Sequence, residues 1–201
     1  GTGNELANVI KGNSGANLLQ GYGGDDVLAG NLANDILQGG SGNDTLRDRG
    51  GNNVLDGGPG NDKLTGGDGN ELFVGGSGND TVNAGDGADI IAFDRGDGQD
   101  VVAASQGADN TLSLGGGIRH QDLAFRKSGS SLVLQAGLNP QTGVQDQITF
   151  NGWYSATADN RSVARLQIVA EAMDAFDPHS GDPLLASKIQ TFDFLGLVGA
   201  F

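Results

Sequence analysis

Apolar side chains recur at every ninth position through the first half of the chain. Two positions before each of them lies Asn, Asp or Glu, and two positions earlier again lies Gly in eight of ten repeats. The repeating unit is GGxGxD followed by x-apolar-x, as in residues 39–47 (GGSGNDTLR). The ten apolar positions are Ile10, Leu19, Leu28, Leu37, Leu46, Leu55, Leu64, Phe73, Val82 and Ile91. Such a regular period predicts a repetitive fold in which every unit adds one residue to a shared core.

Each unit predicts a turn followed by a short strand. Glycine permits positive φ values and close backbone approach in the first six residues. In the last three residues the middle side chain faces opposite to its neighbours. The apolar residues align only if the chain winds into coils of two repeats. We therefore expect an all-β fold over residues 1–92, a right-handed parallel β-roll whose coils stack about 4.8 Å apart.

Stacked turns bring oxygen ligands together between neighbouring coils. Repeats two apart in the sequence lie on the same side of the roll, and each presents backbone carbonyls and one carboxylate to the gap. Several hard oxygen ligands in flexible geometry suit Ca²⁺ better than Mg²⁺. The chain has no Cys, and His120 and His179 lie outside the repeats, so sites for softer metals are not predicted.

The two sides of the predicted roll differ in sequence. The first turn face comprises the turns at residues 3–8, 21–26, 39–44, 57–62 and 75–80. Its aspartates Asp26, Asp44, Asp62 and Asp80 form three adjacent pairs, which predicts three strong calcium sites. A fourth site is predicted where Asp80 pairs with Asp97 or Asp100 of the segment RGDGQD.

The second turn face departs from the repeat pattern. It comprises the turns at residues 12–17, 30–35, 48–53, 66–71 and 84–89. Asn53 replaces a carboxylate there, and Asp48 and Arg49 replace the leading glycines of their turn. We expect this face to be mostly free of metal and closed by hydrogen bonds, with Glu71 and Asp89 as the one candidate exception.

The array resembles the RTX nonapeptide repeats, which bind calcium in a parallel β-roll. The resemblance covers residues 3–92 and implies Ca²⁺ as the cofactor, with type I secretion and calcium-dependent folding outside the cell. It also implies that backbone carbonyls of the first four turn residues complete each site. These carbonyls belong to Gly21, Gly23, Gly39, Gly40, Ser41, Gly42, Gly57, Gly58, Pro59, Gly60, Gly76 and Gly78.

After residue 92 the nine-residue grid ends. Strand-like runs at 111–114, 123–126, 132–135 and 147–150 predict a β-rich continuation or cap over residues 93–160. The features GGGIRHQDLAF, SLVLQ, DQITFNGWY and RLQIV resemble the region that follows RTX repeats in haemolysin-type proteins. A cap is needed because the last coil would otherwise expose a strand edge and the apolar interior.

The sequence pattern of residues 161–201 predicts helix. Apolar residues from Val163 to Phe176 are three or four apart, and Asp182-Pro183 is typical of a helix start before a short helix at about 184–190. We expect 161–201 to be a mainly helical extension, and both chain ends to be cuts from a longer protein. The pair Trp153 and Tyr154 belongs either to the cap core or to a carbohydrate platform together with Arg119 and Arg126.

The negative net charge of the repeats predicts that folding is linked to metal binding. The formal net charge of the chain is −14, which argues against nucleic acid and anionic membrane surfaces as direct partners. Residues 3–92 carry 13 acidic and 4 basic side chains, a net charge of −9 that three calcium ions would largely offset. Without calcium, the glycine-rich, acidic array is compatible with a flexible linker. No apolar run is long enough for a membrane span, and no N-terminal secretion signal is visible.

The residues favour a binding module over an enzyme. The sequence contains neither HExxH nor G-x-S-x-G, and calcium explains the regular spacing of the carboxylates. Our first hypothesis is a calcium-binding structural module, expected to be monomeric, of a large secreted or cell-surface bacterial protein, for example an adhesin. The alternatives are a carbohydrate- or surface-binding accessory module, or the secretion region, of an extracellular RTX enzyme or toxin.

Overall fold

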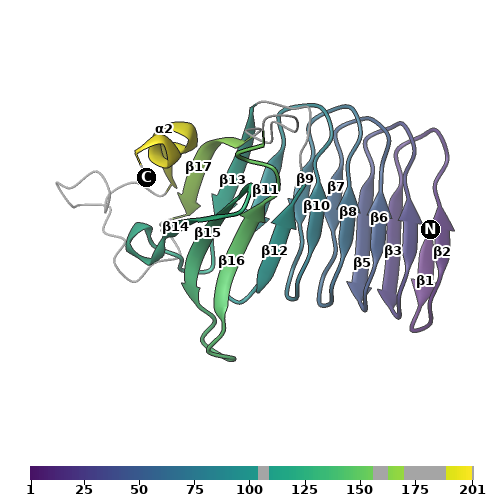
Figure 1. Ribbon diagram of the computed structural model, residues 1–201. Coiled ribbons are helices and arrows are strands. Elements are labelled where there is room, and N and C mark those ends of the chain that lie inside the picture. The colour runs from purple at the N-terminus through teal and green to yellow at the C-terminus, as the bar shows by residue number, and fades with distance from the viewer. Residues whose placement is uncertain (104–108, 156–162, 170–188, 201) are drawn as a thin grey trace, which may run out of the picture.

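The computed structural model describes residues 1–103, 109–155, 163–169 and 189–200. The chain winds into a flattened roll in which successive strands alternate between two sheets, and the cap closes one end (Figure 1). In the first sheet the order is β1 (Thr2–Asn4), β3 (Leu18–Gly23), β5 (Ile36–Ser41), β7 (Val54–Asp56), β9 (Leu72–Val74), β11 (Ile90–Phe93), β13 (Asn110–Leu114), β17 (Val163–Val169) and β18 (Ile189–Asp193). In the second it is β2 (Val9–Lys11), β4 (Val27–Ala29), β6 (Thr45–Arg47), β8 (Lys63–Thr65), β10 (Thr81–Asn83), β12 (Gln99–Val102), β16 (Gln145–Phe150), β15 (Ser131–Leu138) and β14 (Ala124–Ser128).

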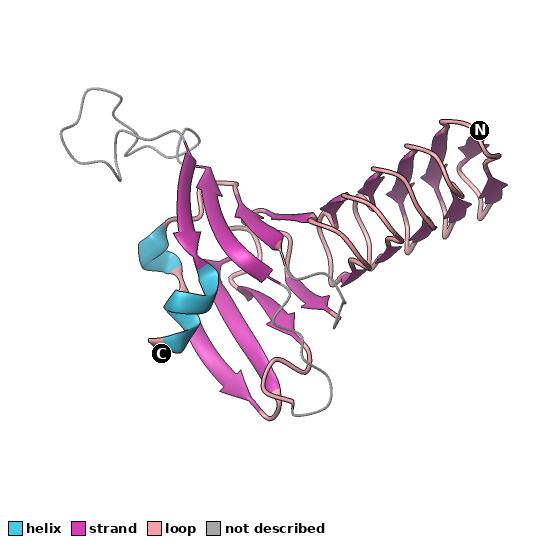
Figure 2. Ribbon diagram, turned by 90° about the horizontal axis from the view of Figure 1, so that it is seen from above, coloured by secondary structure: helices cyan, strands magenta, loops and turns pink. Residues whose placement is uncertain are grey.

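The pairing within the roll is parallel and in register at eighteen-residue steps. Leu37 lies beside Leu19 and Leu55, and Leu46 lies beside Leu28 and Leu64. The predicted all-β parallel roll is therefore confirmed. Each coil supplies one strand to each sheet, and the turns between the sheets form the two turn faces (Figure 2).

The predicted apolar ladder fills the space between the sheets. The side chains from Leu19 to Ile91 on the nine-residue grid are all at least 96% buried, and Ile10 packs against them at the open end. A buried leucine contributes about 1.5–3 kcal/mol relative to an exposed one. Because every ladder residue touches only its own and adjacent coils, the stability of the roll depends on stacking.

The cap continues both sheets and then closes the interior. In the second sheet, β16 pairs with β12 in parallel, and β15 and β14 add antiparallel strands. In the first sheet, β17 pairs in parallel with β13 and β18 lies antiparallel to β17. The short helix α2 (Phe194–Gly199) packs on this end and buries Phe194 and Val198, and a single 3₁₀ turn, η1 (His120–Asp122), precedes β14.

Trp153 belongs to the cap core. Its side chain is 3% exposed, and its ring lies 5.6 Å from Phe150 and 5.5 Å from Phe194 between ring centroids. Tyr154 is more exposed and carries Lys127 over its ring. A carbohydrate platform built on the Trp153 ring is therefore wrong, because that ring is covered.

The helix expected from residue 163 is wrong over residues 163–169, which form the strand β17. A bulge explains the misleading spacing: the register between β13 and β17 shifts at Asn110 and Thr111, so the inward positions Val163 and Leu166 are three residues apart rather than two. Ile189–Asp193 is also a strand, and the remainder of the predicted helix at 184–190, with Asp182-Pro183, Met173 and Phe176, lies outside the described residues. Among the described residues, no helix has the length and apolar character needed to cross a membrane.

Candidate calcium sites

The aspartates of the first turn face form a continuous hydrogen-bonded ladder. One carboxylate oxygen of each aspartate, Oδ1, accepts the backbone N–H of the residue eighteen positions earlier. The donor–acceptor distances are 2.6 Å from Asn8 to Asp26, 2.7 Å from Asp26 to Asp44, 2.6 Å from Asp44 to Asp62 and 2.7 Å from Asp62 to Asp80. These four aspartates are at most 2% exposed, so the stacking of the coils withdraws all four carboxylates from water.

The second oxygen of each of these carboxylates is buried and has no hydrogen-bond partner among the described residues. It faces a small space in front of the first glycine of its own turn. A Cβ added to Gly39 would meet Oδ2 of Asp44 and the carbonyl oxygen of Gly57, and a Cβ on Gly57 would meet Oδ2 of Asp62 and the carbonyl of Gly75. Each of these spaces therefore combines a carboxylate oxygen with a carbonyl oxygen of the next coil.

This arrangement fits a calcium ion. A buried carboxylate without a donor or a counter-charge is energetically costly, and a cation among oxygen atoms removes the cost. Among the described residues, no three Asp, Glu or His side chains form a metal-binding group by themselves, so backbone carbonyls must supply the remaining ligands. Asp26, Asp44, Asp62 and Asp80 would each supply a carboxylate to the gaps between them, and the calcium ions would link neighbouring coils electrostatically.

The predicted carbonyl ligands lie in the same gaps, and some also hydrogen-bond between coils. Gly57 and Pro59 accept the N–H groups of Gly40 and Gly42, each at 3.0 Å. At the N-terminal end, the corresponding space lies in front of Gly21, beside Asp26 and the Gly39 carbonyl. The predicted ligand Gly23 lies next to Ser41 and Glu5. The carbonyls of Gly40, Gly42, Gly58 and Gly60 point at glycines of the next coil.

Glycine occupies two positions with special backbone geometry in the first-face turns at 39–44, 57–62 and 75–80. The second and fourth residues have positive φ, for example 96° at Gly58 and 144° at Gly60. Tyr22 occupies the second position of its turn with φ of 80°, a conformation that is strained for a side-chain-bearing residue. At the fourth position a side chain is also excluded by space, because a Cβ on Gly60 would collide with the carbonyl of Gly42.

We expect Gly60→Ala to destabilise the calcium-loaded protein by about 2 kcal/mol or more, because it adds backbone strain to a steric clash between coils. Urea denaturation in saturating calcium measures this loss. Gly129→Ala is the matched control: Gly129 also has a positive φ, of 59°, but a Cβ there would meet nothing within 4 Å. Its expected loss is about 1 kcal/mol, the cost of the left-handed conformation alone. Equal losses in the two variants would contradict the steric argument.

The second turn face carries the same ladder but different chemistry between the coils. Asp35 Oδ1 accepts the N–H of Asn17 at 2.6 Å, and Asn53 Oδ1 accepts that of Asp35 at 2.8 Å. The amide group of Asn53 then donates to the Gly51 carbonyl and to Glu71. Hydrogen bonds thus close the gap at Asn53, where the sequence lacks a carboxylate.

Asp48 changes the second face in a way that the sequence did not indicate. It occupies the first turn position, where the repeat has glycine, and its Oδ1 accepts the N–H groups of Arg49 and Gly50. Its Oδ2 turns into the space in front of Gly30, which Oδ2 of Asp35 also faces. Burial raises the pKa of Asp48, and the charge of Asp35 adds to that rise.

Glu71 and Asp89, the expected exception on this face, are brought together. Glu71 N–H donates to Asp89 Oδ1 at 2.9 Å, and each side chain keeps one buried oxygen without a partner in the described part of the chain. Burial, and then the charge of Asp89, raise the pKa of Glu71 to about 7. Asn110, which the repeat grid did not include, ends this ladder by accepting the Asp89 N–H at 2.8 Å.

On the first face, Asp100 continues the ladder beyond Asp80. It accepts the Asp80 N–H at 2.9 Å, so Asp100 rather than Asp97 occupies the sixth turn position. Burial raises the pKa of Asp80 to about 7 and that of Asp100 to about 8, and neighbouring carboxylates add to both shifts. Asp97 lies in the same turn, three residues earlier, and its Oδ2 accepts the N–H of Asp94.

A second ladder, at the fifth turn position, is a feature that the sequence pattern did not predict. Asn61 N–H donates to Asn43 Oδ1, and Asn79 N–H donates to Asn61 Oδ1. The recurrence of Asn before Asp in three turns of the first face was the available signal. This ladder satisfies backbone donors at the rim of each turn and leaves the carboxylates for the gaps between the coils.

Comparison with known proteins identifies the repeats. The RTX calcium-binding nonapeptide repeat family matches residues 2–37, 30–64 and 65–100. Residues 2–100 belong to the RTX calcium-binding repeat family. Among solved structures, the extracellular lipase LipA from Serratia marcescens is similar, with 19% sequence identity and a TM-score of 0.39. The match covers 76% of this chain and 38% of the lipase chain. No curated protein matches the chain significantly.

Proposed function

We propose that this RTX chain is a calcium-folded structural module of a larger secreted or cell-surface bacterial protein, for example an adhesin. The observation that carries the proposal is the row of buried carboxylate oxygens without partners on the first turn face. These oxygens are spaced by one coil each, and the family to which residues 2–100 belong binds calcium. The module itself has no catalytic role in this proposal.

The negative charge of the turns makes folding of the module depend on calcium. In low calcium, the acidic turns repel one another and oppose stacking, while the glycine content favours an unfolded chain. In high calcium, ions fill the gaps and stacking becomes favourable, so that binding free energy becomes folding free energy. An unfolded chain passes a type I secretion channel more easily than a folded roll, and calcium outside the cell would then complete folding.

A calcium titration followed by far-ultraviolet circular dichroism tests this function. We expect a cooperative rise of β-sheet signal with calcium and none with magnesium at the same concentration, because the gaps offer flexible oxygen geometry. Equal spectra in chelator and in calcium would refute calcium-dependent folding. The alternative is a glycan-binding module. The Trp153 ring does not support it, because that ring is buried.

A further inference from the structure

The last coil of the roll meets the cap on the first turn face. Strand β16 pairs with β12, with Gln147 beside Gln99, and the N–H of Gln147 donates to the carbonyl of Gly98 at 2.8 Å. The strand β16 therefore takes the place that the next coil would occupy. Asp146, the residue before Gln147, lies at the position where that coil would contribute its turn.

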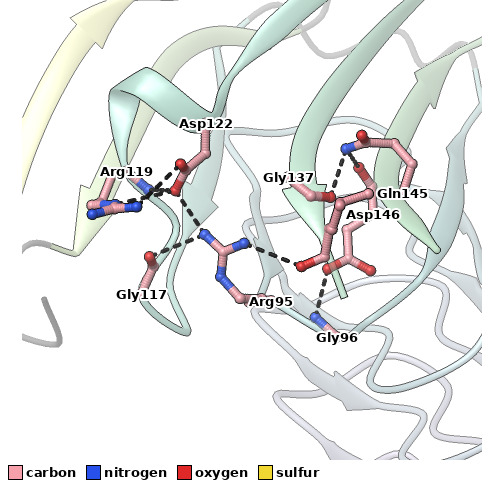
Figure 3. Close-up of polar contacts among 9 residues, drawn as sticks. Arg95, Gly96, Gly117, Arg119, Asp122, Gly137, Gln145 and Asp146 are labelled. Atoms are coloured by element: carbon pink, nitrogen blue, oxygen red, sulfur yellow. Dashed lines mark hydrogen bonds and ion pairs between the residues drawn. The ribbon is translucent and has the colours of Figure 1, made fainter. Parts of the chain in front are cut away.

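The Asp146 side chain substitutes for a missing backbone carbonyl. Within the roll, the N–H of the second turn residue donates to the carbonyl of the next coil's first glycine, as from Gly58 to Gly75 at 3.1 Å. In the last coil, the corresponding N–H of Gly96 donates to Asp146 Oδ2 at 2.9 Å (Figure 3). The cap thus reproduces the inter-coil contact with a carboxylate and adds a negative charge to the gap.

The other oxygen of this carboxylate is left without a partner in the described part of the chain. Asp146 is fully buried, and its Oδ1 has no hydrogen-bond partner among the described residues. Arg95, the residue before Gly96, is directed elsewhere: its guanidinium contacts Asp122 at 2.7 Å and the carbonyls of Gly117 and Leu138 (Figure 3). Within the described residues, no basic side chain forms an ion pair with Asp146.

Two further carboxylates of the last coil lie at this junction: Asp97 accepts the N–H of Asp94 within the last turn, and Asp100 lies in β12, which pairs with β16. An open groove of about 590 Å³, lined in part by Asp97, Gly98, Asn139 and Asp146, gives ions access from solvent. The junction therefore combines concentrated negative charge, oxygen donors and access.

We propose that the junction between roll and cap binds a divalent cation, with Asp146 as the carboxylate ligand from the cap and Asp97 as the carboxylate ligand from the last coil. Backbone carbonyls of the last turn complete the all-oxygen donor set, which suits calcium. This site rests on the proposed function, since it extends the calcium ladder by one ion. It couples cap docking to calcium, because the ion is shared between the two parts.

Asp146→Asn in the full chain tests the site, since the amide oxygen can still accept the Gly96 N–H while the charge is lost. Trp153 is the single tryptophan of the chain and lies in the cap core, so its fluorescence reports the cap, while far-ultraviolet circular dichroism also reports the strands of the roll. Isothermal calorimetry is expected to find one ion fewer than in the wild type. The calcium midpoint of the Trp153 signal is expected to rise at least tenfold while the dichroism midpoint stays within twofold.

Asp122→Asn is the matched control, because it removes another cap carboxylate, which pairs with Arg95 and Arg119 and does not line the groove beside Asp146. It should keep the ion count of the wild type. If the Asp146→Asn variant does not fold, the Asp97→Asn variant is used instead, because Asp97 is less buried than Asp146. The expected loss is again one bound ion. An unchanged ion count and Trp153 midpoint in the junction variant would overturn the proposal and leave Asp146 as a hydrogen-bond acceptor. A chain without any calcium response would instead overturn the proposed function.

Discussion

Asp62→Asn is expected to remove two calcium ions with a single substitution. Each first-face aspartate lies between two gaps: Asp62 Oδ1 accepts the Asp44 N–H in the gap below, and Oδ2 faces the Gly75 carbonyl in the gap above. The asparagine can keep the first contact, as Asn53 does for the Asp35 N–H at 2.8 Å, but it loses the charge that serves both gaps. We expect the calcium midpoint for folding to rise at least tenfold, or about 1.4 kcal/mol of binding free energy. Asp44→Asn should behave in the same way.

Asn53→Ala is the control from the second turn face. It leaves the buried Asp35 N–H without its acceptor, so stability is expected to fall by about 1–3 kcal/mol. The number of bound ions should not change, because Asn53 offers an amide to Glu71 rather than a charge to a metal. Calorimetric ion counts and calcium midpoints for the two variants are compared at the same pH. If both variants lost the same number of ions, the assignment of strong sites to the first face would be wrong.

The sequence predicted the roll well because its signal is repeated. A nine-residue period in both glycine and apolar residues determines where each turn and strand lies, so the inward face from Leu19 to Ile91 and the row of aspartates from Asp26 to Asp80 follow from the sequence alone. The repeats agree on one register, since a shift of one residue would place every apolar side chain on the outside. The predicted strand positions in the cap were also close to those observed for β13 to β16.

The missed features are those that occur once. Asp146 lies 46 residues after Asp100 in the sequence. It comes to lie beside the last coil only because β16 pairs with β12, and no local sequence pattern encodes that pairing. The strand β17 imitated helical spacing because a bulge separates its first two inward residues. Asp48 breaks the glycine rule of its turn, which by itself indicates the loss of a site. The structure shows instead a carboxylate turned toward Asp35. Each of these features depends on contacts between segments and not on the repeat.

The pH dependence of stability is expected to reverse between chelator and calcium. Burial raises the pKa of Asp62 to about 6 and that of Asp80 to about 7, and the inter-coil N–H bonds only partly oppose the shift. Without metal, the folded state therefore binds protons more tightly than the unfolded chain, in which these groups titrate near their ordinary value of 3.8. The resulting stabilisation is complete below that value and is lost as the pH rises through about 6 to 7.

Urea denaturation at pH 5 and pH 8 measures the reversal. In chelator, the folded fraction and the urea midpoint should be higher at pH 5, because protons neutralise the buried carboxylates. In saturating calcium they should be higher at pH 8, because the ion needs the ionised oxygens and protons compete with it. Asp62→Asn should weaken both trends, since an amide neither binds the proton nor holds the ion with a charge. A chain that is more stable at pH 8 under both conditions would show that these carboxylates are stabilised by contacts within the protein, and that calcium is not their partner.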